Sequence, residues 1–337
     1  MRNKKGYLSL ALITAFLAIA GCGTQSPVSR TVYAMDTVMS LTVYGSEEYL
    51  DGAESIINDI EDELSVTDKE SDIYKLNLEK EASVSDDTAY IISEALKLCE
   101  ETGGALDISI YPVVKAWGFT TGEYRVPTDD EIADLLKSVS YEDISVDGNV
   151  VSCGAETQID LGSVAKGYTA DRLKSYLKEN GVESALLSLG GNIQTVGNKP
   201  DGSLWMIAVS DPEEDGYIGA VSVSEKAVVT SGGYERSFEE NGVTYHHIID
   251  PATGYPSNNG FVSVTVIADD GLMCDAYSTA LFVMGPEEAF EFYEKEKSFD
   301  GVFLTSDGVL YITEGIEDSF VTMGRFENVT PVVLYHD

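Results

Sequence analysis

The segment from Thr244 to Thr279 holds two groups of reactive side chains in a short stretch of the chain. It begins with T-Y-H-H-I-I-D-P-A-T-G-Y-P and ends with G-L-M-C-D-A-Y-S-T-A. The chain has 3 histidines, and two of them, His246 and His247, are adjacent in the first group. Because imidazole titrates near neutral pH, either ring could act as a general base. The first group is therefore a candidate for proton transfer.

The second group places oxygen ligands on one face of a predicted helix. Asp275, Ser278 and Thr279 recur at i, i+3 and i+4, and side chains at that spacing are neighbours on a helix. A carboxylate with two hydroxyls is a hard-oxygen set of the kind that Mg²⁺ or Ca²⁺ prefers. A histidine near such a cation indicates chemistry on a phosphate-bearing ligand. The alternative is a solvated Asp275 beside hydroxyls that bond back to their own helix.

A candidate anion site lies at Asp160 to Gly167, which reads D-L-G-S-V-A-K-G. A predicted strand ends at Asp160 and a helix begins near Ser163, so free backbone N–H groups and a positive helix end face outward. Lys166 lies one turn into this helix, where its ammonium could reach a phosphate. The G-x-x-x-x-G-K-[ST] spacing of a P-loop is absent, and for this segment alone an ordinary helix N-cap is the simpler interpretation.

Residues 1–21 are predicted to be a lipoprotein signal peptide. Basic residues precede an uncharged apolar stretch, Tyr7–Ala20, which is short for a membrane span. The following I-A-G-C resembles the lipobox of bacterial lipoproteins and predicts lipidation of Cys22. Residues 22–30 are then a polar tether, and the protein is expected at the cell membrane, lipid-anchored on the extracytoplasmic side. An ordinary secretory signal with a chance cysteine is the alternative.

The composition excludes some classes of binding partner. A formal net charge of -37 argues against nucleic acid and against a polybasic membrane contact, which leaves the lipid anchor as the predicted membrane attachment. An anionic ligand would need a local cation, either a lysine or a metal ion. Cys99, Cys153 and Cys274 show no C-x-x-C spacing; buried free thiols are expected, and whether any two of them pair stays open.

The hydrophobic periodicity predicts an α+β fold. Strict alternation predicts a strand from Met35 to Val43, and apolar residues three and four apart predict a helix from Leu50 to Leu64. Strands follow one another more often than they alternate with helices, so we expect largely antiparallel sheets with packed helices in a single large domain, residues 31–330. Further helices are predicted at 87–102, from 128, at 163–180, 271–284 and 286–297, and further strands at 106–111, around 144, 150 and 158, within 184–229, and at 243–249 and 261–268.

Seven ordered motifs together resemble the FAD:protein FMN transferase family, the ApbE-type flavin transferases. They are M-D-T, G-G-A-L-D-I-S, D-L-G-S-V-A-K-G-Y, L-L-S-L-G-G-N-I, V-V-T-S-G-G-Y-E-R, H-I-I-D-P-A-T-G and D-A-Y-S-T-A, between about Val32 and Arg325. The resemblance implies Mg²⁺-dependent cleavage of the FAD pyrophosphate, release of AMP, and attachment of FMN through a phosphoester to a Thr or Ser of an acceptor protein. It implies as acceptor a membrane redox subunit or an extracytoplasmic flavoprotein.

The resemblance also implies roles for individual residues. His247 matches the catalytic histidine of the family. His246 is expected to be structural, because alternation along a strand points adjacent rings to opposite faces. The implied metal ligands are Asp275, Thr279, the nearby Ser278 and a main-chain oxygen of Ser163. The residues assigned to the flavin-nucleotide side are Met35, Ala105, Leu106, Asp107, Asp160, Lys166 and Ile249.

One position departs from the family pattern. The family often has an aromatic residue in the loop after the first helix, where it stacks on the flavin nucleotide, whereas this loop reads L-S-V-T-D with Thr67 at the corresponding position. A lost ring forfeits about 1 kcal/mol of stacking, although Tyr74 could substitute. Two alternative functions therefore stay open: a Mg²⁺-dependent FAD pyrophosphatase giving FMN and AMP, and a non-catalytic lipid-anchored flavin-binding protein. A base beside a metal site argues against the second.

Overall fold

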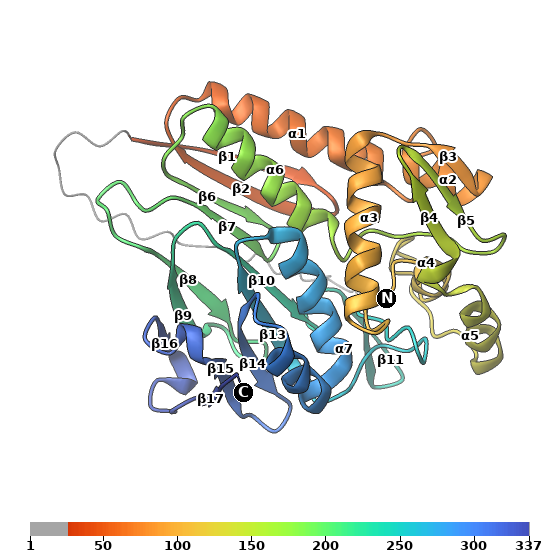
Figure 1. Cartoon of the computed structure of the whole chain (residues 1–337). Coiled ribbons are helices and arrows are strands. Elements are labelled where there is room, and N and C mark those ends of the chain that lie inside the picture. The colour runs from red at the N-terminus through yellow and green to blue at the C-terminus, as the bar shows by residue number, and fades with distance from the viewer. Residues whose placement is uncertain (1–25, 337) are drawn as a thin grey trace, which may run out of the picture.

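The computed structural model describes residues 26–336, and its centre is a nine-stranded sheet (Figure 1). Neighbouring strands in this sheet are antiparallel except β15 and β17, which are parallel. The strands, in sheet order, are β1 (Pro27–Ala34), β2 (Thr37–Tyr44), β6 (Ala185–Leu189), β7 (Asn192–Val196), β10 (Ala227–Gly232), β13 (Phe261–Ala268), β14 (Asp300–Thr305), β15 (Leu310–Thr313) and β17 (Val332–Leu334). The expected α+β fold with largely antiparallel sheets is confirmed.

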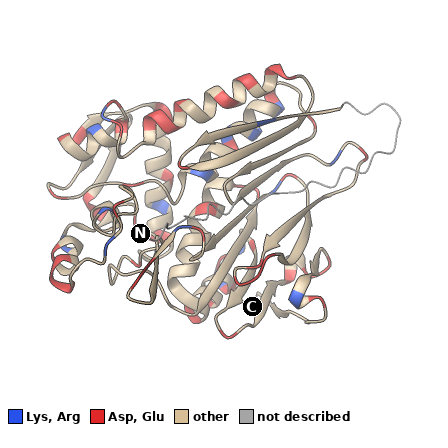
Figure 2. Cartoon of the chain, turned by 180° about the vertical axis from the view of Figure 1, so that it is seen from behind, with Lys and Arg blue, Asp and Glu red and all other residues tan. Residues whose placement is uncertain are grey.

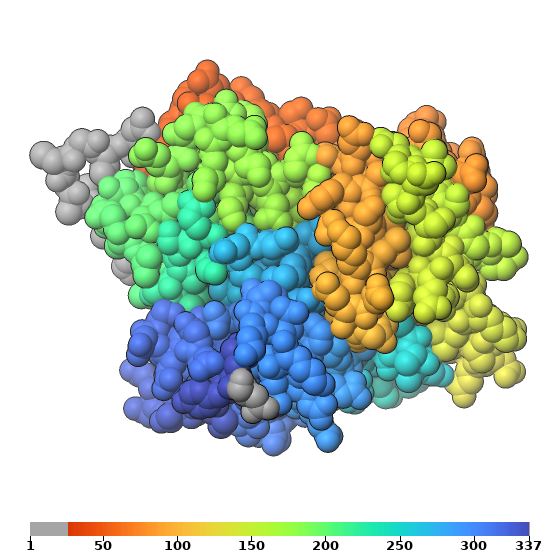
Figure 3. All heavy atoms as spheres, viewed as in Figure 1, coloured from red at the N-terminus to blue at the C-terminus, as the bar shows by residue number. Residues whose placement is uncertain are grey.

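Helices cover one face of this sheet and a smaller sheet covers the other. The helical layer consists of α1 (Glu48–Leu64), α6 (Ala165–Glu179) and α7 (Gly271–Lys295), with α3 (Asp86–Glu101) packed against α7. The atoms of α3, α6 and α7 meet on one side of the molecule (Figure 3). On the other face, apolar side chains of the large sheet pack against the sheet of β8 (Trp205–Ser210), β9 (Tyr217–Val223) and β16 (Phe320–Thr322).

Shorter elements gather at one end of the large sheet, on the right of Figure 1. They are α2 (Asp72–Glu79), α4 (Tyr111–Ala116), α5 (Asp129–Leu135), the sheet of β3 (Glu81–Ser83), β5 (Val150–Cys153) and β4 (Ile144–Asp147), and the hairpin of β11 (Ser237–Glu240) and β12 (Val243–His246). Single 3-10 turns are found at Leu136–Ser138, Tyr141–Asp143, Glu314–Ile316 and Gly324–Phe326. Because α2 and α4 lie within loops of the expected fold, this end is more helical than the periodicity predicts.

Several elements form where the sequence places them, for local reasons. The buried face of α1 consists of the apolar residues that recur at three and four: Leu50, Ala53, Ile57, Ile60 and Leu64. Helix α5 begins after Thr128, whose hydroxyl accepts the Glu131 N–H, as the capping spacing predicts. The break expected between helices at 271–284 and 286–297 is present within α7, where Gly285 adopts a non-helical φ of 76° just before Pro286.

Three expectations about elements are wrong. The strand predicted from Met35 begins at Thr37, because Met35 and Asp36 form the turn between β1 and β2 with φ of 49° and 57°. Non-glycine residues with positive φ are uncommon, and the alternating pattern gives no sign of this turn. Residues 27–30, expected in the tether, belong to β1. The strand expected at 106–111 is absent, since Pro112 lies in the first turn of α4, where its missing N–H costs nothing.

The distribution of acidic residues and the state of the cysteines agree with what the composition predicts. Acidic residues are spread along the described chain rather than gathered in one tail (Figure 2). Cys99, Cys153 and Cys274 are all free thiols, which answers the open question of pairing for this structure. The predicted signal peptide and Cys22 lie outside the described residues. No helix between residues 26 and 336 has the length and apolar character needed to cross a membrane.

Candidate functional site

A close crossing of α6 and α7 positions Asp275. The helices meet at two glycines: a Cβ on Gly167 would lie 2.1 Å from the Gly271 carbonyl oxygen and 2.8 Å from Asp275 Cβ. Without side chains at the crossing, the backbone of α6 approaches α7 closely enough for Asp275 Oδ2 to accept the Gly167 N–H at 2.9 Å. Asp275 is buried, with 4% of its surface exposed. Its carboxylate is therefore fixed against the first turn of α6.

Three hydroxyls cluster on the α7 face that carries Asp275, and one of them bonds back to its own helix, as the alternative interpretation expects. Ser278 and Thr279 share the α7 face with Asp275, as their spacing predicts, and Ser278 donates to the Asp275 carbonyl oxygen at 3.0 Å. Ser231, near the end of β10, brings its Oγ to 2.8 Å from Ser278 Oγ and 3.4 Å from Thr279 Oγ1. The structure thus adds a third hydroxyl from a neighbouring strand to the predicted set.

The donor set fits a hard divalent cation that takes part of its coordination from substrate. One carboxylate with neighbouring hydroxyls offers oxygen ligands only, and Mg²⁺ is commonly held by one or two carboxylates together with substrate phosphates. Within residues 26–336 no three His, Cys, Asp or Glu side chains converge in a metal-binding group. The amide nitrogen of Asn192 is buried without a protein partner and its side chain lies next to Asp275. Asp275 is thus the one carboxylate among these candidate ligands.

Lys166 links the metal-ligand candidates to the histidine. Its Nζ lies 3.8 Å from Asp275 Oδ1. Burial raises the pKa of Asp275, and the charge of Lys166 lowers it. The same ammonium lowers the pKa of His247, after the larger effects of burial and Arg236. The charge of the predicted anion-binding lysine therefore acts on both the carboxylate and the candidate base.

The two histidine rings lie against different neighbours, as expected, but the strand expected at 243–249 ends at His246 and His247 lies in the bend that follows. His246 Nε2 is 2.8 Å from the Ser257 carbonyl oxygen, and its ring meets Phe282 of α7 edge-on. The His247 ring lies near Phe119, with centroids 6.4 Å apart, and its Nδ1 is buried without a protein partner. Burial, Arg236 and Lys166 together lower the pKa of His247 to about 3. His246 Nδ1 is likewise buried without a protein partner, so the two rings differ in their other contacts: Ser257 holds His246 Nε2, whereas His247 lies near the charges of Arg236 and Lys166.

The turn before α6 contributes Asp160 and Ser163. Asp160 Oδ1 accepts the Gly162 N–H at 2.7 Å, which closes the tight turn that precedes the helix. Burial raises the pKa of Asp160, whereas Arg236 and Lys166 lower it, so this carboxyl faces the same cations as His247. Ser163 is partly buried in this turn, just before α6 begins. Its role as a main-chain ligand stays a prediction.

The residues predicted to bind the flavin nucleotide differ in how far the protein itself already uses their polar groups. Met35 lies at the β1–β2 turn, where its N–H donates to Glu61 at 2.6 Å. Asp107 accepts from Ser109 and Tyr141, so its buried carboxylate is already used by the protein. Its neighbours Ala105 and Leu106 are partly and fully buried, and Ile249 packs into an aromatic cluster. A ligand contact at Asp107 would therefore come from the backbone.

The loop that carries Thr67 reaches the same region through Tyr111. The Thr67 N–H donates to Ser65 Oγ at 3.2 Å, and the Thr67 side chain is exposed. Tyr111 donates to the carbonyl oxygen of the neighbouring Val66 at 3.5 Å, and Asp160 contributes to raising its pKa after the larger effect of burial. The loop thus lies close to the turn before α6. A larger side chain at position 67 has open space to enter.

Two charged residues of the site, Glu235 and Arg236, are not predicted from the sequence. Arg236 donates to the Phe119 carbonyl oxygen at 2.8 Å, pairs with Asp36 at 3.6 Å, and its own carbonyl accepts the His247 N–H. Glu235 is exposed, yet desolvation by the surrounding protein raises its pKa to about 7 despite the opposing charge of Lys166. Both residues, like Ser231, belong to the motif V-V-T-S-G-G-Y-E-R. The motif could therefore have indicated them, but hydrophobic periodicity does not predict which residues their side chains contact.

The chain is similar to known proteins over most of its length. The sequence model of the ApbE family matches residues 35–303. An FAD:protein FMN transferase of Vibrio cholerae is 32% identical over 294 residues, which cover 82% of this chain and 88% of the relative. One of Treponema pallidum is 31% identical over 350 residues, which cover 94% of this chain and 96% of the relative.

Solved structures extend the similarity to the fold. The ApbE protein of Thermotoga maritima superposes with a TM-score of 0.81 at 31% identity, covering 86% of this chain and 98% of that one. The flavin transferase ApbE of Vibrio cholerae gives 0.78 at 29% identity, with 87% and 99% covered. The fold and the sequence thus point to the same group of proteins.

Proposed function

The chain belongs to the ApbE family, and from this premise we propose that it is an FAD:protein FMN transferase that acts with Mg²⁺. In the proposed reaction a Thr or Ser hydroxyl of an acceptor protein attacks the FMN-side phosphorus of FAD. The bond from that phosphorus to the bridging oxygen breaks, AMP leaves, and FMN stays on the acceptor as a phosphoester. The observation that carries this proposal is the convergence of Asp275 and His247 on Lys166.

The protein's own groups divide the work in this proposal. Lys166 and Arg236 supply local positive charge to an anionic diphosphate in a chain of formal net charge -37. His247 takes the proton of the attacking hydroxyl, since it is neutral and one of its ring nitrogens has no protein partner. Asp275, Ser278, Thr279 and Ser163 would hold the cation, which when bound neutralises charge on the diphosphate.

A second function has one observation in its favour. Thr67 is exposed and carries no ring, so the flavin end of FAD lacks the stacking partner that the family often has at this position. A loosely held flavin would let water compete with the acceptor hydroxyl, and the same residues would then act as a FAD pyrophosphatase. Transfer remains the leading proposal because the relatives that match most of the chain are FAD:protein FMN transferases.

We also propose the place of action. A lipid on Cys22 would hold the protein at the cell membrane on the extracytoplasmic side, and the acceptor would then be a membrane redox subunit or an extracytoplasmic flavoprotein. The lipobox sequence that precedes the described residues supports this proposal.

A mass measurement tests the proposed reaction. The chain without residues 1–22 is incubated with FAD, Mg²⁺ and a candidate acceptor protein, and the acceptor is weighed while AMP and FMN are quantified. Transfer predicts a covalent mass gain of one FMN unit on the acceptor and an equal amount of AMP. Free FMN with AMP and an unchanged acceptor would instead assign the pyrophosphatase reaction, and no AMP at all would contradict both.

Replacing Thr67 with tyrosine should tighten FAD binding by up to about tenfold, because a stacked ring contributes roughly 1 kcal/mol. The position is exposed, so the ring can enter without displacing packed side chains. Titration of FAD by fluorescence quenching measures the change, with Thr67→Val as a control that alters polarity without adding a ring. Unchanged or weaker binding would mean that Tyr111 or Tyr74 already fills this place.

The pH dependence of kcat/KM should show no acid limb from His247 near pH 6.5. Burial, Arg236 and Lys166 lower the pKa of His247 to about 3, so the ring stays deprotonated from pH 8 to about 5. Glu235 and Asp171, whose pKa values are raised to about 7 and about 6, are carboxyls that titrate in that range. When both are replaced, in Glu235→Gln with Asp171→Asn, the profile should therefore be flat from pH 5 to 8. A limb near 6.5 in that double variant would show that the base has its ordinary pKa.

A further inference from the structure

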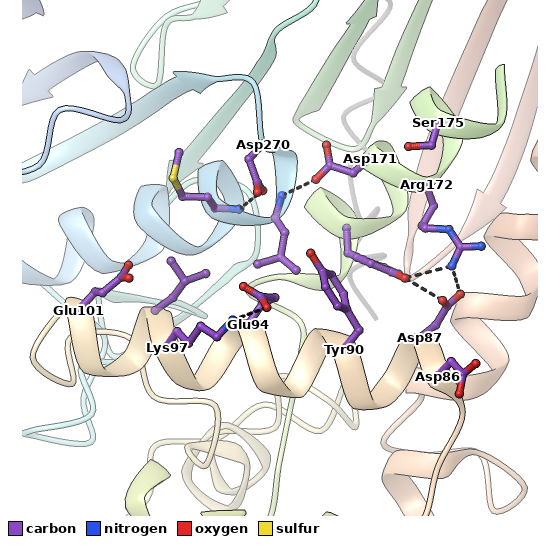
Figure 4. A pocket seen from close by; sticks show the side chains of 14 residues that line it. Asp86, Asp87, Tyr90, Glu94, Lys97, Glu101, Asp171, Arg172, Ser175 and Asp270 are labelled. Carbon is purple, nitrogen blue, oxygen red and sulfur yellow. Dashed lines mark hydrogen bonds and ion pairs between the residues drawn. The ribbon is translucent and has the colours of Figure 1, made fainter. Parts of the chain in front are cut away.

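A groove of about 620 Å³ lies between α3, α6 and the start of α7 (Figure 4). Its two basic side chains are paired within the protein: Arg172 with Asp87, and Lys97 with Glu94 at 2.6 Å. The lining also holds Asp86, Glu101, Asp171 and Asp270, so the groove is acidic. Its importance lies at the end where Asp171 of α6 meets the beginning of α7.

Asp171 holds the first turn of α7 from outside that helix. Its two carboxylate oxygens accept the Gly271 N–H at 2.9 and 2.8 Å, and Oδ2 also accepts the Leu272 N–H at 2.9 Å. The next amide, that of Met273, donates to Asp270 of α7 itself at 2.9 Å. The first N–H groups of a helix have no intrahelical partner, and here two of them are satisfied by a carboxylate of another helix.

The contact is reciprocal. Asp275 of α7 accepts the Gly167 N–H at the start of α6, while Asp171 of α6 accepts the amides at the start of α7. The two exchanges flank the glycine crossing, where the backbones have no side chain between them. Asp275 follows Gly271 by about one helical turn, so a shift of α7 along its axis moves its carboxylate by a similar amount.

We propose that Asp171 is a positioning residue for the metal-binding face of α7. By holding the Gly271 and Leu272 amides it fixes α7 against α6, and so sets where the Asp275 carboxylate meets Gly167 and Lys166. The inference rests on the metal role of Asp275 given under the proposed function. It adds a residue that makes no contact with the metal ligands' side chains yet determines their placement.

Metal binding by two matched variants tests this role. Asp171→Asn keeps the size of the side chain but removes its charge and one acceptor oxygen, and it should weaken Mn²⁺ binding in the presence of ADP by roughly 10- to 100-fold. Asp270→Ala removes the hydrogen bond to Met273 at the same end of α7 but no bond to α6. It should lower the melting temperature and leave the Mn²⁺ dissociation constant unchanged. Equal Mn²⁺ affinity in Asp171→Asn and the wild type overturns the proposal.

Amide hydrogen exchange separates this inference from the proposed function. In Asp171→Asn the Gly167 amide should exchange faster, because Asp275 no longer holds it at the same place, whereas Asp270→Ala should leave it unchanged. If the wild type binds no Mn²⁺, the metal role of Asp275 fails, and Gly167 exchange alone decides the positioning role. If Asp171→Asn does not fold, Asp171→Glu takes its place: the added methylene keeps the charge but moves α7, and unaltered Gly167 exchange would contradict the proposal.

Discussion

Replacing Asp275 with alanine should abolish flavin transfer while the fold persists. Asp275 is the one carboxylate in the oxygen set formed with Ser278, Thr279 and Ser231, so without it the cation would be held by neutral donors and diphosphate oxygens alone. Its removal also frees the Gly167 N–H, a loss of about 1–3 kcal/mol for a buried donor. That cost lowers stability but leaves the large sheet untouched.

Asp275→Asn is the matched control for stability. The amide oxygen can still accept the Gly167 N–H, so this variant should melt closer to the wild type than Asp275→Ala. It carries no charge and should be as inactive, because a neutral amide oxygen is a weaker Mg²⁺ ligand than a carboxylate. AMP release as a function of Mg²⁺ concentration measures both variants. A variant with wild-type rate and Mg²⁺ dependence would show that the cation is held elsewhere.

The second large effect is expected at His247. Its removal should slow transfer by roughly 10²–10⁴-fold, the usual contribution of a general base, with little change in FAD affinity. The ring is neutral at all working pH values, and proton transfer from the acceptor hydroxyl is not part of ground-state FAD binding. Single-turnover transfer rates, measured with FAD titrations on the same preparation, separate the two quantities.

His246→Ala is the natural comparison, because it removes an adjacent imidazole. His246 bonds to the Ser257 carbonyl oxygen and packs on Phe282, so the variant should lose stability but keep most of its transfer rate. The FAD dissociation constant should stay close to the wild-type value in both variants. An equal loss of rate in the two would refute the division of roles between the histidines.

The part of the fold that the sequence predicts best is the part with long, regular periodicity. The helices at α1 and α3 and the strand β13 form close to their expected bounds, because their apolar spacing is uninterrupted. The turn at Met35 and Asp36 could not be predicted, since neither residue type usually adopts positive φ. The strand expected at 106–111 does not form, because Pro112 lies in the first turn of a helix, where proline is favourable.

The candidate site also has a part that the sequence predicts and a part that it does not. Asp275, Ser278 and Thr279 belong to one helix, so their spacing alone places them on one face. Ser231 joins them only because β10 lies beneath α7, and that neighbourhood depends on the order of strands in the sheet. Glu235 and Arg236 are close to Lys166 and His247 for the same reason. Contacts between distant segments are set by topology, which a local pattern does not encode.

The early start of β1 limits how far the active site can lie from the membrane. If Cys22 carries the lipid as proposed, about five residues separate the anchor from Pro27, and a fully extended chain of that length spans at most roughly 18 Å. Strand β1 then runs 8 residues, about 26 Å, to the turn whose Asp36 pairs with Arg236 beside His247. The reactive centre would therefore stay within about 45 Å of the bilayer surface. Acceptors whose hydroxyl stands farther out would have to bend toward the membrane to be modified.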